Sequence, residues 1–371
     1  MKIIFACGGT GGHINPALAV AGTIKEKHPD AKIAFIGNEK GMESRLVPAA
    51  GYDFYPIHVA GFQRRLSAKN IARNVSALGK AVTSGFEAQK ILKKFKPDLV
   101  VGMGGYVSGP VLRKAHQMGI KTATHEQNAF PGVTTKMLVK QMDTVMLAMP
   151  AAMKHLPERH YIITGNPVRP AILNISRQEA RKALGVDDDH QFILSFGGSL
   201  GADCINKAVA DVMAKHWNTG LYYHYHATGR SSWEWMPELL RQKGVDLARA
   251  PKLRVTEYIH DMDLCMAAAD LVISRAGAIT LSEIEVQGKA AILIPSPYVA
   301  ENHQYHNAMT LQNRGAAIVI EEKNLTDGVL WEQVQQLLRD PNRLAQMGKA
   351  AKDGAYADAN ERIYSALMKL L

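Results

Sequence analysis

Residues 3–21, IIFACGGTGGHINPALAVA, decide the fold of this chain. A run of apolar residues is followed by four glycines within positions 8–12, and then by residues that suit a helix. This order predicts a buried strand, a tight turn and a helix, as at the start of a doubly wound α/β domain. Glycines in such a turn let backbone N–H groups and the positive end of the helix approach an anion, usually a phosphate.

The turn itself fits neither of the common phosphate-binding patterns. It is not a G-x-G-x-x-G sequence, and no Gly-Lys-Ser or Gly-Lys-Thr follows it. Ordinary dinucleotide loops and nucleoside-triphosphate loops are therefore disfavoured. A tight strand-to-helix turn that binds no ligand is the alternative here.

The opening stretch is repeated in the second half of the chain. Moved forward by 189 residues without gaps, it lies on residues 192–210, FILSFGGSLGADCINKAVA, so that Gly8 falls on Gly197 and Gly12 on Gly201. A third glycine loop, GMGGYVSGP at 102–110, also follows an apolar run. Loops at the carboxyl ends of parallel strands line the crevice of such a sheet, so three of them favour a substrate rich in phosphate.

Apolar, β-branched runs alternate with segments of helical period along the whole chain. We expect strands within residues 2–7, 32–37, 98–104, 121–127, 143–149, 161–165, 191–198, 221–229, 270–277, 290–297 and 316–322. Strands that are apolar throughout and separated by helices are typical of parallel sheets covered on both faces. The sequence therefore predicts two Rossmann-like, doubly wound α/β domains.

The proline-containing segment GNPVRPAI, residues 165–172, marks the expected boundary between these domains. We place the N-terminal domain at 1–165 and the C-terminal domain at 166–345. Residues 346–371 end in a helix that we expect to pack back on the N-terminal domain.

The net charge of +10 is unevenly distributed. Residues 1–165 carry 22 Lys and Arg against 10 Asp and Glu, net +12, whereas residues 166–371 carry 22 against 24, net −2. A basic N-terminal half fits an anionic partner: nucleic acid, an anionic membrane surface or a phosphorylated substrate.

Composition narrows the class of protein further. No apolar run reaches the roughly 18 residues of a membrane-spanning helix, and the N-terminus does not resemble a signal peptide, so we expect a cytoplasmic protein. Cys7, Cys204 and Cys265 are widely spaced, which disfavours both a disulfide framework and a structural zinc site.

A basic amphipathic segment lies at residues 70–96. Its apolar residues at helical spacing are Ile71, Val75, Leu78, Val82 and Phe86, and its basic neighbours are Lys69, Arg73, Lys80, Lys90, Lys93 and Lys94. Such a segment can bind an anionic membrane surface. A helix that packs on its own sheet is the alternative.

Seven motifs carry a resemblance to a known family. They are GGTGGHINPALAVA (8–21), GMGGYVSGP (102–110), HEQNAFPG (125–132), GNPVR (165–169), FGGSLGA (196–202), RAGAITLSE (275–283) and ENHQYHNA (301–308). Their order and spacing resemble the bacterial transferases that add N-acetylglucosamine to undecaprenyl-pyrophosphoryl-MurNAc-pentapeptide, which converts lipid I to lipid II in peptidoglycan synthesis. The resemblance covers residues 1 to about 310.

The resemblance implies the glycosyltransferase architecture called GT-B, with two domains facing a cleft and UDP-N-acetylglucosamine held mostly by the C-terminal one. The residues that it assigns to this donor are Thr10, Gly11, Gly12, Asn128, Arg169, Ser199, Ile259, Ala278, Ile279, Thr280, Leu281, Ser282, Glu283 and Gln304. Glu283 matches the carboxylate that accepts hydrogen bonds from both ribose hydroxyls.

The other donor contacts follow from the same resemblance. The backbone N–H groups of residues 278–283 face the diphosphate. Ser199 and Arg169 match contacts on the phosphate side, and Ile259 matches a backbone contact to uracil. Gln304 and Asn128 match residues that bind hydroxyls of the sugar. Residues 10–12 belong to a loop that closes over the donor.

The acceptor and the cellular site are also implied by the resemblance. Gly104, Gly105, Tyr106 and Ser108 belong to the acceptor-binding loop. Lipid I carries a polyprenyl chain, so the protein is expected at the cytoplasmic face of the bacterial inner membrane, held peripherally through its basic N-terminal domain. Other proteins of cell-wall synthesis are candidate partners.

The implied reaction inverts the anomeric carbon and needs a base near the attacking hydroxyl. His13 is the first candidate, because an imidazole titrates near neutral pH; a role in orienting the loop or contacting phosphate is the alternative. His125 and Glu126 are competing candidates, with a hydrogen-bonded structural pair as their alternative.

We expect neither a cofactor nor a metal site. The Asp261-x-Asp263 pair, which resembles the metal-binding pair of other glycosyltransferases, is interpreted as a helix cap. The charge of the leaving group would then be stabilised by helix ends and Arg169.

Two further classes of protein remain as alternatives. A UDP-N-acetylglucosamine 2-epimerase would share the architecture and the donor but needs no lipid; the GMGGYVSGP loop and the basic N-terminal domain argue against it. A nucleic-acid-binding protein fits the charge, but the sequence has no recognition motif, so we expect no nucleic acid among the partners.

Overall fold

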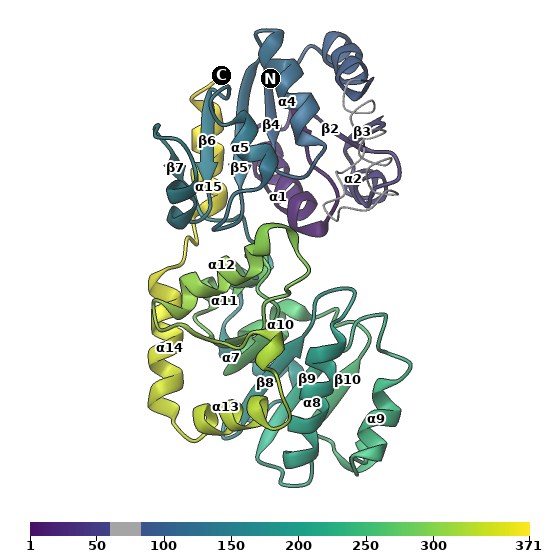
Figure 1. Ribbon diagram of the computed structural model, residues 1–371, viewed down its shortest axis with the longest axis vertical. Helices are drawn as coiled ribbons and strands as arrows, with labels where there is room; N and C mark the ends of the chain where they lie inside the picture. Colours follow the sequence, from purple (N-terminus) through teal and green to yellow (C-terminus); the bar gives the residue numbers. More distant parts are fainter. Residues whose placement is uncertain (60–82) are drawn as a thin grey trace. The chain divides into compact units, whose positions relative to one another are not determined.

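The computed structural model describes residues 1–59 and 83–371. The chain divides into two compact units: an N-terminal unit of residues 1–167 and 358–371, and a C-terminal unit of residues 168–357. Each unit is built on one sheet whose paired strands are all parallel (Figure 1). Two α/β domains with parallel sheets, as the sequence predicts, are thereby confirmed.

The N-terminal unit holds a seven-stranded sheet. Its strands are β1 (Lys2–Ala6), β2 (Lys32–Asn38), β3 (Asp53–Ile57), β4 (Leu99–Gly102), β5 (Lys121–Glu126), β6 (Thr144–Leu147) and β7 (Ile162–Ile163). Its helices are α1 (Gly11–Lys27), α2 (Glu43–Ala49), a helix described over 83–95, α4 (Ser108–Gln117), α5 (Val133–Leu138), η1 (Pro150–His155) and α15 (Ala359–Met368). The strand order is β3-β2-β1-β4-β5-β6-β7.

The C-terminal unit holds a six-stranded sheet. Its strands are β8 (Gln191–Phe196), β9 (Tyr222–Ala227), β10 (Leu253–Thr256), β11 (Leu271–Ser274), β12 (Ala290–Leu293) and β13 (Ala317–Val319). Its helices are α6 (Pro170–Asn174), α7 (Arg177–Leu184), α8 (Asp203–His216), α9 (Met236–Gln242), α10 (Met262–Ala268), α11 (Ala278–Gln287), α12 (His303–Gln312), α13 (Val329–Leu338) and α14 (Pro341–Asp353), with short 3₁₀ turns η2 (Leu247–Arg249), η3 (Ala300–Asn302) and η4 (Glu322–Asn324).

Both sheets share one topology. The C-terminal order, β10-β9-β8-β11-β12-β13, repeats the first six positions of the N-terminal order. The repeat found in the sequence falls on the central strands, because a shift of 189 residues carries the first residue of β1, Lys2, onto the first residue of β8, Gln191. The repeated sequence therefore reflects a repeated fold.

The opening stretch forms β1 and α1 because both faces of the strand are buried. Ile3 and Phe5 pack on one face of the sheet with Ile14 of α1, whereas Ile4 and Ala6 pack on the other face. Alternate residues of a strand point to opposite faces, so a strand covered on both sides must be apolar throughout.

The two strands that the sequence analysis missed are β3 and β10. Each is the outermost strand on its side of the sheet and pairs with one neighbour. Edge strands bury only part of their surface, so they do not need a continuous apolar run. Both strands contain polar and half-exposed side chains, so neither forms a continuous apolar run in the sequence.

The C-terminal segment returns to the N-terminal unit later than expected. Residues 168–357 form one unit, so the returning segment begins at Asp358, and the expected start at residue 346 is wrong. The reason is that α14 places Leu344 and Met347 in the core of the C-terminal unit. The terminal helix α15 does pack on the N-terminal unit, where the Tyr364 hydroxyl lies 2.9 Å from Nε2 of His28.

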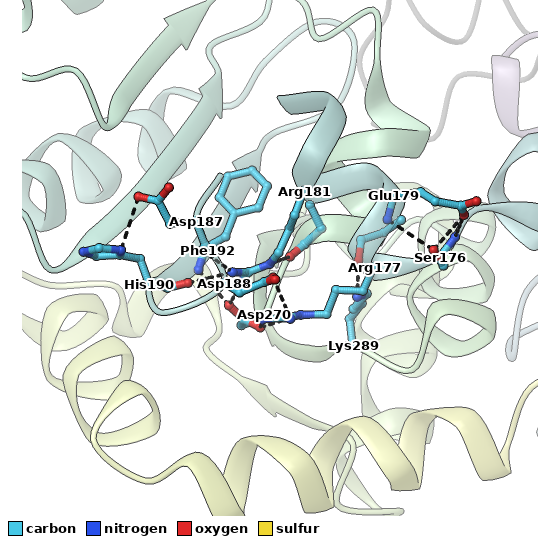
Figure 2. A network of polar contacts seen from close by, with 12 residues as sticks. Ser176, Arg177, Glu179, Arg181, Asp187, Asp188, His190, Phe192, Asp270 and Lys289 are labelled. Atoms are coloured by element: carbon cyan, nitrogen blue, oxygen red, sulfur yellow. Dashed lines mark hydrogen bonds and ion pairs between the residues drawn. The ribbon is translucent and has the colours of Figure 1, made fainter. Parts of the chain in front are cut away.

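Asp270 closes the amino end of the C-terminal sheet. It directly precedes β11, and its carboxylate accepts hydrogen bonds from Arg177, Arg181 and the backbone N–H of Phe192 in β8 (Figure 2). Arg181 is buried, and its guanidinium also donates to carbonyl groups of the neighbouring loops. This network fixes the end of the sheet that lies opposite the glycine turn.

Two observations concern the membrane. In the described ranges 1–59 and 83–371, no helix is long and apolar enough to cross a bilayer. Residues 70–82 of the basic amphipathic segment at 70–96 lie outside the described residues; of its apolar stripe only Phe86 is described, and it is 60% exposed.

Candidate functional site

The first glycine turn joins β1 to α1 at the carboxyl end of the N-terminal sheet. Thr10 occupies the N-cap position of α1, and the first turn of the helix carries neither a capping side chain nor an acidic residue. Thr10 and Gly12 are exposed, and Gly11 is half-buried. The positive end of this helix can therefore receive an anion, as the sequence predicts for a loop that contacts the donor.

A buried carboxylate that the sequence analysis missed also sits at this turn. Glu43, the first residue of α2, accepts hydrogen bonds from the backbone N–H of Gly9 and from that of Asn38. A Cβ built on Gly8 would lie 2.3 Å from its Oε1. Position 8 therefore requires glycine because the Glu43 carboxyl group occupies the space that a Cβ would take.

His13 lies in the first turn of α1 with one ring nitrogen toward a carbonyl. Its Nδ1 is 3.1 Å from the oxygen of Gly8, which can only accept, so Nδ1 carries the proton of the neutral ring and Nε2 keeps its lone pair. Burial lowers the pKa of His13 below its usual 6.5, although Glu126, the Gly8 carbonyl and Glu43 oppose this shift. At neutral pH the ring is therefore an uncharged base at Nε2.

The acceptor loop predicted from the sequence packs directly on this turn. Gly104 and Gly105 have φ values of +89° and +80°, in the left-handed region that favours glycine. A Cβ on Gly104 would lie 2.6 Å from Cδ2 of His13, and one on Gly105 would lie 2.2 Å from the oxygen of Gly8. The two loops thus form one surface around the imidazole.

Tyr106 and Ser108 hold the acceptor loop from within the N-terminal unit. The Tyr106 hydroxyl accepts a hydrogen bond from the amide of Asn38. Ser108 is buried, and its hydroxyl is within hydrogen-bond distance of the carbonyl oxygens of Ala6 and Gly104. Ser108 is therefore placed to shape the loop through Gly104.

We expect Gly105→Ala to abolish most of the activity of this site and to lower the melting temperature. Alanine at φ +80° costs about 1–2 kcal/mol, and its Cβ would also overlap the Gly8 carbonyl. Gly119→Ala is the matched control, because Gly119 has φ +72° with open space around its Cβ position. Equal losses in the two variants, measured by thermal denaturation and activity assays, would show that contact with Gly8 does not matter.

Glu126 ends β5 and organises the loop that follows. Its Oε1 accepts from the backbone N–H and the side-chain amide of Asn128, and its Oε2 accepts from the N–H of Gly132 and the hydroxyl of Thr135. Four donors therefore already occupy both oxygens of this buried carboxylate. Asn128, predicted to bind the sugar, is half-buried and oriented by this carboxylate.

His125 is fully buried on the same strand. Its Nε2 lies 3.1 Å from the hydroxyl of Thr164 and 3.0 Å from the carbonyl of Gly165, and its Nδ1 lies 3.2 Å from the amide of Gln127. Burial lowers the pKa of His125 to about 4. The ring therefore joins β5 to the segment after β7.

In the C-terminal unit, Glu283 lies in the second turn of α11, and its side chain is almost fully buried. Nε and Nη2 of Arg169 donate to its Oε1, at 3.4 and 3.3 Å. Burial raises the pKa of Glu283, and Arg169 opposes this shift. Both hydrogen bonds reach the same oxygen, so Oε2 is placed to accept from a ligand. Arg169, predicted on the phosphate side, here lies against the predicted ribose carboxylate.

The start of α11 has the features of an anion site. Gly277 is its N-cap, no side chain caps it, and its first turn carries no acidic residue. Ile279 and Thr280 are half-buried, whereas Ala278, Leu281 and Ser282 are buried and contribute through their backbone. By contrast, α8, which follows the second glycine turn, begins with Asp203. Of these two helix starts, that of α11 suits a diphosphate better.

The remaining predicted donor residues of this unit are Ser199 and Ile259, which lie on loops, and Gln304, which lies in the first turn of α12. Ser199 is exposed on the turn 197–201, and Ile259 has a buried side chain that leaves only its backbone for a ligand. Oε1 of Gln304 accepts from the N–H of Ser296 at 2.9 Å. Just before Gln304, Glu301 and Asn302 have φ values of +55° and +49°. Left-handed backbone at two successive non-glycine residues costs energy and is often found at functional sites.

Asp261 occupies the N-cap position of α10, and its carboxylate lies 3.3 Å from Nη1 of Arg254. Its side chain makes no capping hydrogen bond. Among the described residues, no group of three or more His, Cys, Asp or Glu side chains is placed to hold a metal ion.

A cavity of about 800 Å³ opens in the C-terminal unit, at the amino ends of the strands. Its lining includes Arg177, Asp270 and Lys289. Asp270 is already occupied by the two arginines of the network in Figure 2, and Lys289 donates to the carbonyl of Ala267. None of the residues predicted from the sequence lines it.

Comparisons of this chain with family models and with known proteins agree on one family. Residues 3–147 match the glycosyltransferase family 28 N-terminal domain, and residues 192–363 match the glycosyltransferase family 28 C-terminal domain. A protein of Acetivibrio thermocellus described as "UDP-N-acetylglucosamine--N-acetylmuramyl-(pentapeptide) pyrophosphoryl-undecaprenol N-acetylglucosamine transferase" is 45% identical over 100% of this chain and 98% of its own length. A protein of Clostridioides difficile with the same description is 42% identical over 100% of this chain and 89% of its own length.

Solved structures show the same architecture. The crystal structure of the Acinetobacter baumannii protein MurG matches with a TM-score of 0.80 and 29% identity, covering 99% of each chain. A UDP-N-acetylglucosamine 2-epimerase of Neisseria meningitidis matches with a TM-score of 0.64 and 14% identity, covering 100% of each chain. At that identity the second likeness shows the fold alone.

Proposed function

Since the chain belongs to glycosyltransferase family 28 and is an N-acetylglucosaminyltransferase, we propose that it transfers N-acetylglucosamine from UDP-N-acetylglucosamine to undecaprenyl-pyrophosphoryl-MurNAc-pentapeptide. The product is lipid II, the last intracellular precursor of peptidoglycan. The observation that carries this proposal is the 45% identity to a transferase of that description over the whole chain. The 2-epimerase alternative is not favoured, because its likeness is confined to the fold.

The C-terminal unit is proposed to hold the donor. Oε2 of Glu283 accepts from the ribose hydroxyls, while Arg169 holds the other oxygen in place. The uncapped start of α11 directs backbone N–H groups toward the diphosphate. As the bond to the sugar breaks, negative charge grows on the departing UDP, and this helix end stabilises it.

The N-terminal unit is proposed to supply the base. An α-linked donor that yields a β-glycoside reacts by direct displacement, so the acceptor hydroxyl must lose its proton as it attacks. Nε2 of His13 can take that proton because Nδ1 is committed to the Gly8 carbonyl. The contacts of Glu126 and His125 support a different role for these two residues, which is to hold the loops around His13 in position.

The reaction is tested by transfer of radiolabelled N-acetylglucosamine from UDP-N-acetylglucosamine to a lipid I analogue. We expect a lipid-linked disaccharide to form only when donor, acceptor and protein are all present. Intact binding of UDP without any transfer to the analogue would contradict the proposal.

The N-terminal unit also carries a surface suited to a membrane. Phe86 and Met137 are 60% and 67% exposed, and Nζ of Lys114 lies 5.9 Å from the centre of the Phe86 ring. The helices α4 and α5 that carry Lys114 and Met137 pack on each other. Exposed apolar side chains beside lysines favour an anionic bilayer surface. We propose that this face binds the cytoplasmic leaflet of the inner membrane peripherally.

Replacing Phe86 and Met137 together by glutamate should weaken binding to vesicles that contain phosphatidylglycerol by about tenfold or more, since two apolar side chains are lost and two negative charges are added. Leu221→Glu, at a residue of the C-terminal unit that is 57% exposed, is the matched control. Sedimentation with vesicles measures the effect. Unchanged binding of the double variant would assign the membrane contact to another face.

A further inference from the structure

Three buried histidines of the C-terminal unit have no place in the reaction described above. His224 and His226 lie on β9 and face the central strand β8, while His216 ends α8. All three are buried. Histidines two residues apart on a strand share one face of the sheet, so His224 and His226 lie side by side against the same layer of helices.

Hydrogen bonds join these rings to a backbone carbonyl, and that carbonyl fixes the direction of the first links. The amide nitrogen of Asn206 donates to the oxygen of Thr228 at 2.8 Å. A carbonyl can only accept, so the other end of the amide, Oδ1, must face Nε2 of His226, which lies 3.1 Å away. Because Oδ1 is also only an acceptor, Nε2 of His226 carries the proton.

The same reasoning carries through the rest of the chain of contacts. Nδ1 of neutral His226 then accepts, and the hydroxyl of Ser195, 2.8 Å away, donates to it. The Ser195 oxygen in turn accepts from Nε2 of His224 at 2.8 Å. Nδ1 of His224 accepts from Nε2 of His216 at 3.2 Å. In this assignment all three neutral rings carry the proton on Nε2, and every donor points the same way.

Burial supports the neutral state of the three rings. It lowers the pKa values of His216 and His226 to about 4 and that of His224 well below its usual 6.5. At neutral pH each ring thus has one proton to donate and one lone pair to accept with. A run of hydrogen bonds with one direction polarises its members and strengthens each link.

The run of hydrogen bonds through His216, His224, Ser195, His226 and Asn206, called the relay below, ends at the second glycine turn. A Cβ built on Gly201 would lie 2.2 Å from the Thr228 oxygen, and one built on Gly229 would lie 2.1 Å from the backbone nitrogen of Gly201. The hydroxyl of Ser231 donates to the carbonyl of Leu200 at 2.8 Å. The Thr228 carbonyl, which accepts the last hydrogen bond of the relay, therefore packs directly against the turn of residues 197–201.

We propose that the relay His216, His224, Ser195, His226 and Asn206 positions the glycine turn 197–201 for the donor by fixing the carbonyl of Thr228. Its members are positioning residues, since they act through Thr228 and Gly201. This inference rests on the proposed function to the extent that Ser199, on the same turn, contacts the donor.

The protonation pattern is tested first, on the wild-type protein, by NMR of ¹⁵N-labelled histidine at neutral pH. We expect the ring nitrogens of His216, His224 and His226 to show a protonated Nε2 and a bare Nδ1. The opposite tautomer of His226, with its Nδ1 proton toward the carbonyl of Ser195 at 3.1 Å, would leave Nε2 and Asn206 Oδ1 facing each other without a proton. That tautomer, or a charged ring, would overturn the relay.

The positioning role is tested by Ser195→Ala, which removes the central link. We expect the KM for UDP-N-acetylglucosamine to rise about fivefold to tenfold, the effect of one lost buried hydrogen bond, with the acceptor KM and kcat within twofold of wild type. Ser195→Thr, which keeps the hydroxyl, should restore most of the donor affinity. Tyr223→Phe is the control, because Tyr223 lies near the amino end of β9 and its hydroxyl donates to Asp187, in the turn before β8.

An unchanged donor KM in Ser195→Ala, or an equal loss in all three kinetic constants, would overturn the positioning role. Wild-type protein that fails to bind UDP-N-acetylglucosamine would instead contradict the proposed function. If Ser195→Ala folds poorly, the tautomer measurement on the wild-type chain still decides whether the relay exists.

Discussion

His13→Ala should lower kcat by about 10²- to 10⁴-fold, the range found when a general base is removed, while the KM for UDP-N-acetylglucosamine changes little. The reason is the placement of the ring, whose Nδ1 is committed to the Gly8 carbonyl and whose Nε2 edge lies beside the acceptor loop. Steady-state kinetics with a lipid I analogue at saturating donor measures the effect.

The pH dependence of kcat/KM for the wild-type enzyme should reflect the titration of His13. A base works in its neutral form, and burial lowers the pKa of His13 below 6.5. The value of kcat/KM should therefore be constant above about pH 6.5 and fall tenfold per pH unit once the pH drops below the lowered pKa. In His13→Ala this acidic limb should disappear.

The variant His13→Gln distinguishes a role of His13 in proton transfer from a role in supporting the glycine turn. Its side-chain amide can still donate to the Gly8 carbonyl but cannot accept a proton at neutral pH. A loss equal to that of His13→Ala would assign the defect to proton transfer. Near-normal turnover in His13→Gln would instead show that the ring only supports the turn.

Glu283→Ala should raise the KM for UDP-N-acetylglucosamine by roughly 10²- to 10⁴-fold. Two hydrogen bonds from ribose hydroxyls to a carboxylate contribute about 1.5–3 kcal/mol each, or about 3–6 kcal/mol together. Competition by free UDP, measured calorimetrically, should weaken in parallel, because the ribose is common to both ligands.

Replacing Glu283 should affect the stability of the fold less than it affects donor binding. Burial raises the pKa of Glu283, which means that the ionised carboxylate is held in the fold at a cost. The conservative variant Glu283→Gln should therefore melt at or above the wild-type temperature while losing donor affinity. A marked drop in melting temperature would show that the pair with Arg169 is mainly structural.

Glu285→Gln is the matched control for these variants. Glu285 lies two residues further along α11, is equally buried and has a raised pKa, but it pairs with Arg314. Residues two apart on a helix face different directions. We expect Glu285→Gln to leave the KM for the donor within a few-fold of wild type. An increase in KM as large as that of Glu283→Gln would contradict the proposal that Glu283 binds the ribose.

The fold was predictable where burial on both faces forces a continuous apolar run. Strands such as β1 and β8 are central, so their sequences alone reveal them. The edge strands β3 and β10 were missed because half-exposed strands carry no such run. The expected boundary at residue 346 falls inside α14, because an amphipathic pattern shows that a helix buries one face and says nothing about which domain covers it.

The candidate site was predictable as a set of loops, but its chemistry was not. Glu43 lies in a helix that no motif marks, and only the fold brings its carboxylate to the N–H of Gly9. The alternating histidines of LYYHYHATG were visible in the sequence, yet their link to residues 197–201 depends on Ser195 and Asn206, which come from other elements.

The sequence by itself determined the two parallel-sheet domains, the repeated strand and glycine turn, and the family, because apolar runs and turn residues act locally and are written in consecutive positions. Tertiary structure alone decided the burial and the hydrogen-bond partners of each candidate base. In the sequence His13 is the first candidate base and His125 and Glu126 compete with it, but their solvation and hydrogen-bond partners come from elsewhere in the fold: the Gly8 carbonyl for His13, and Gly165 for His125. A pKa and a free lone pair depend on those partners, so only the folded chain could distinguish the proposed base from its supports.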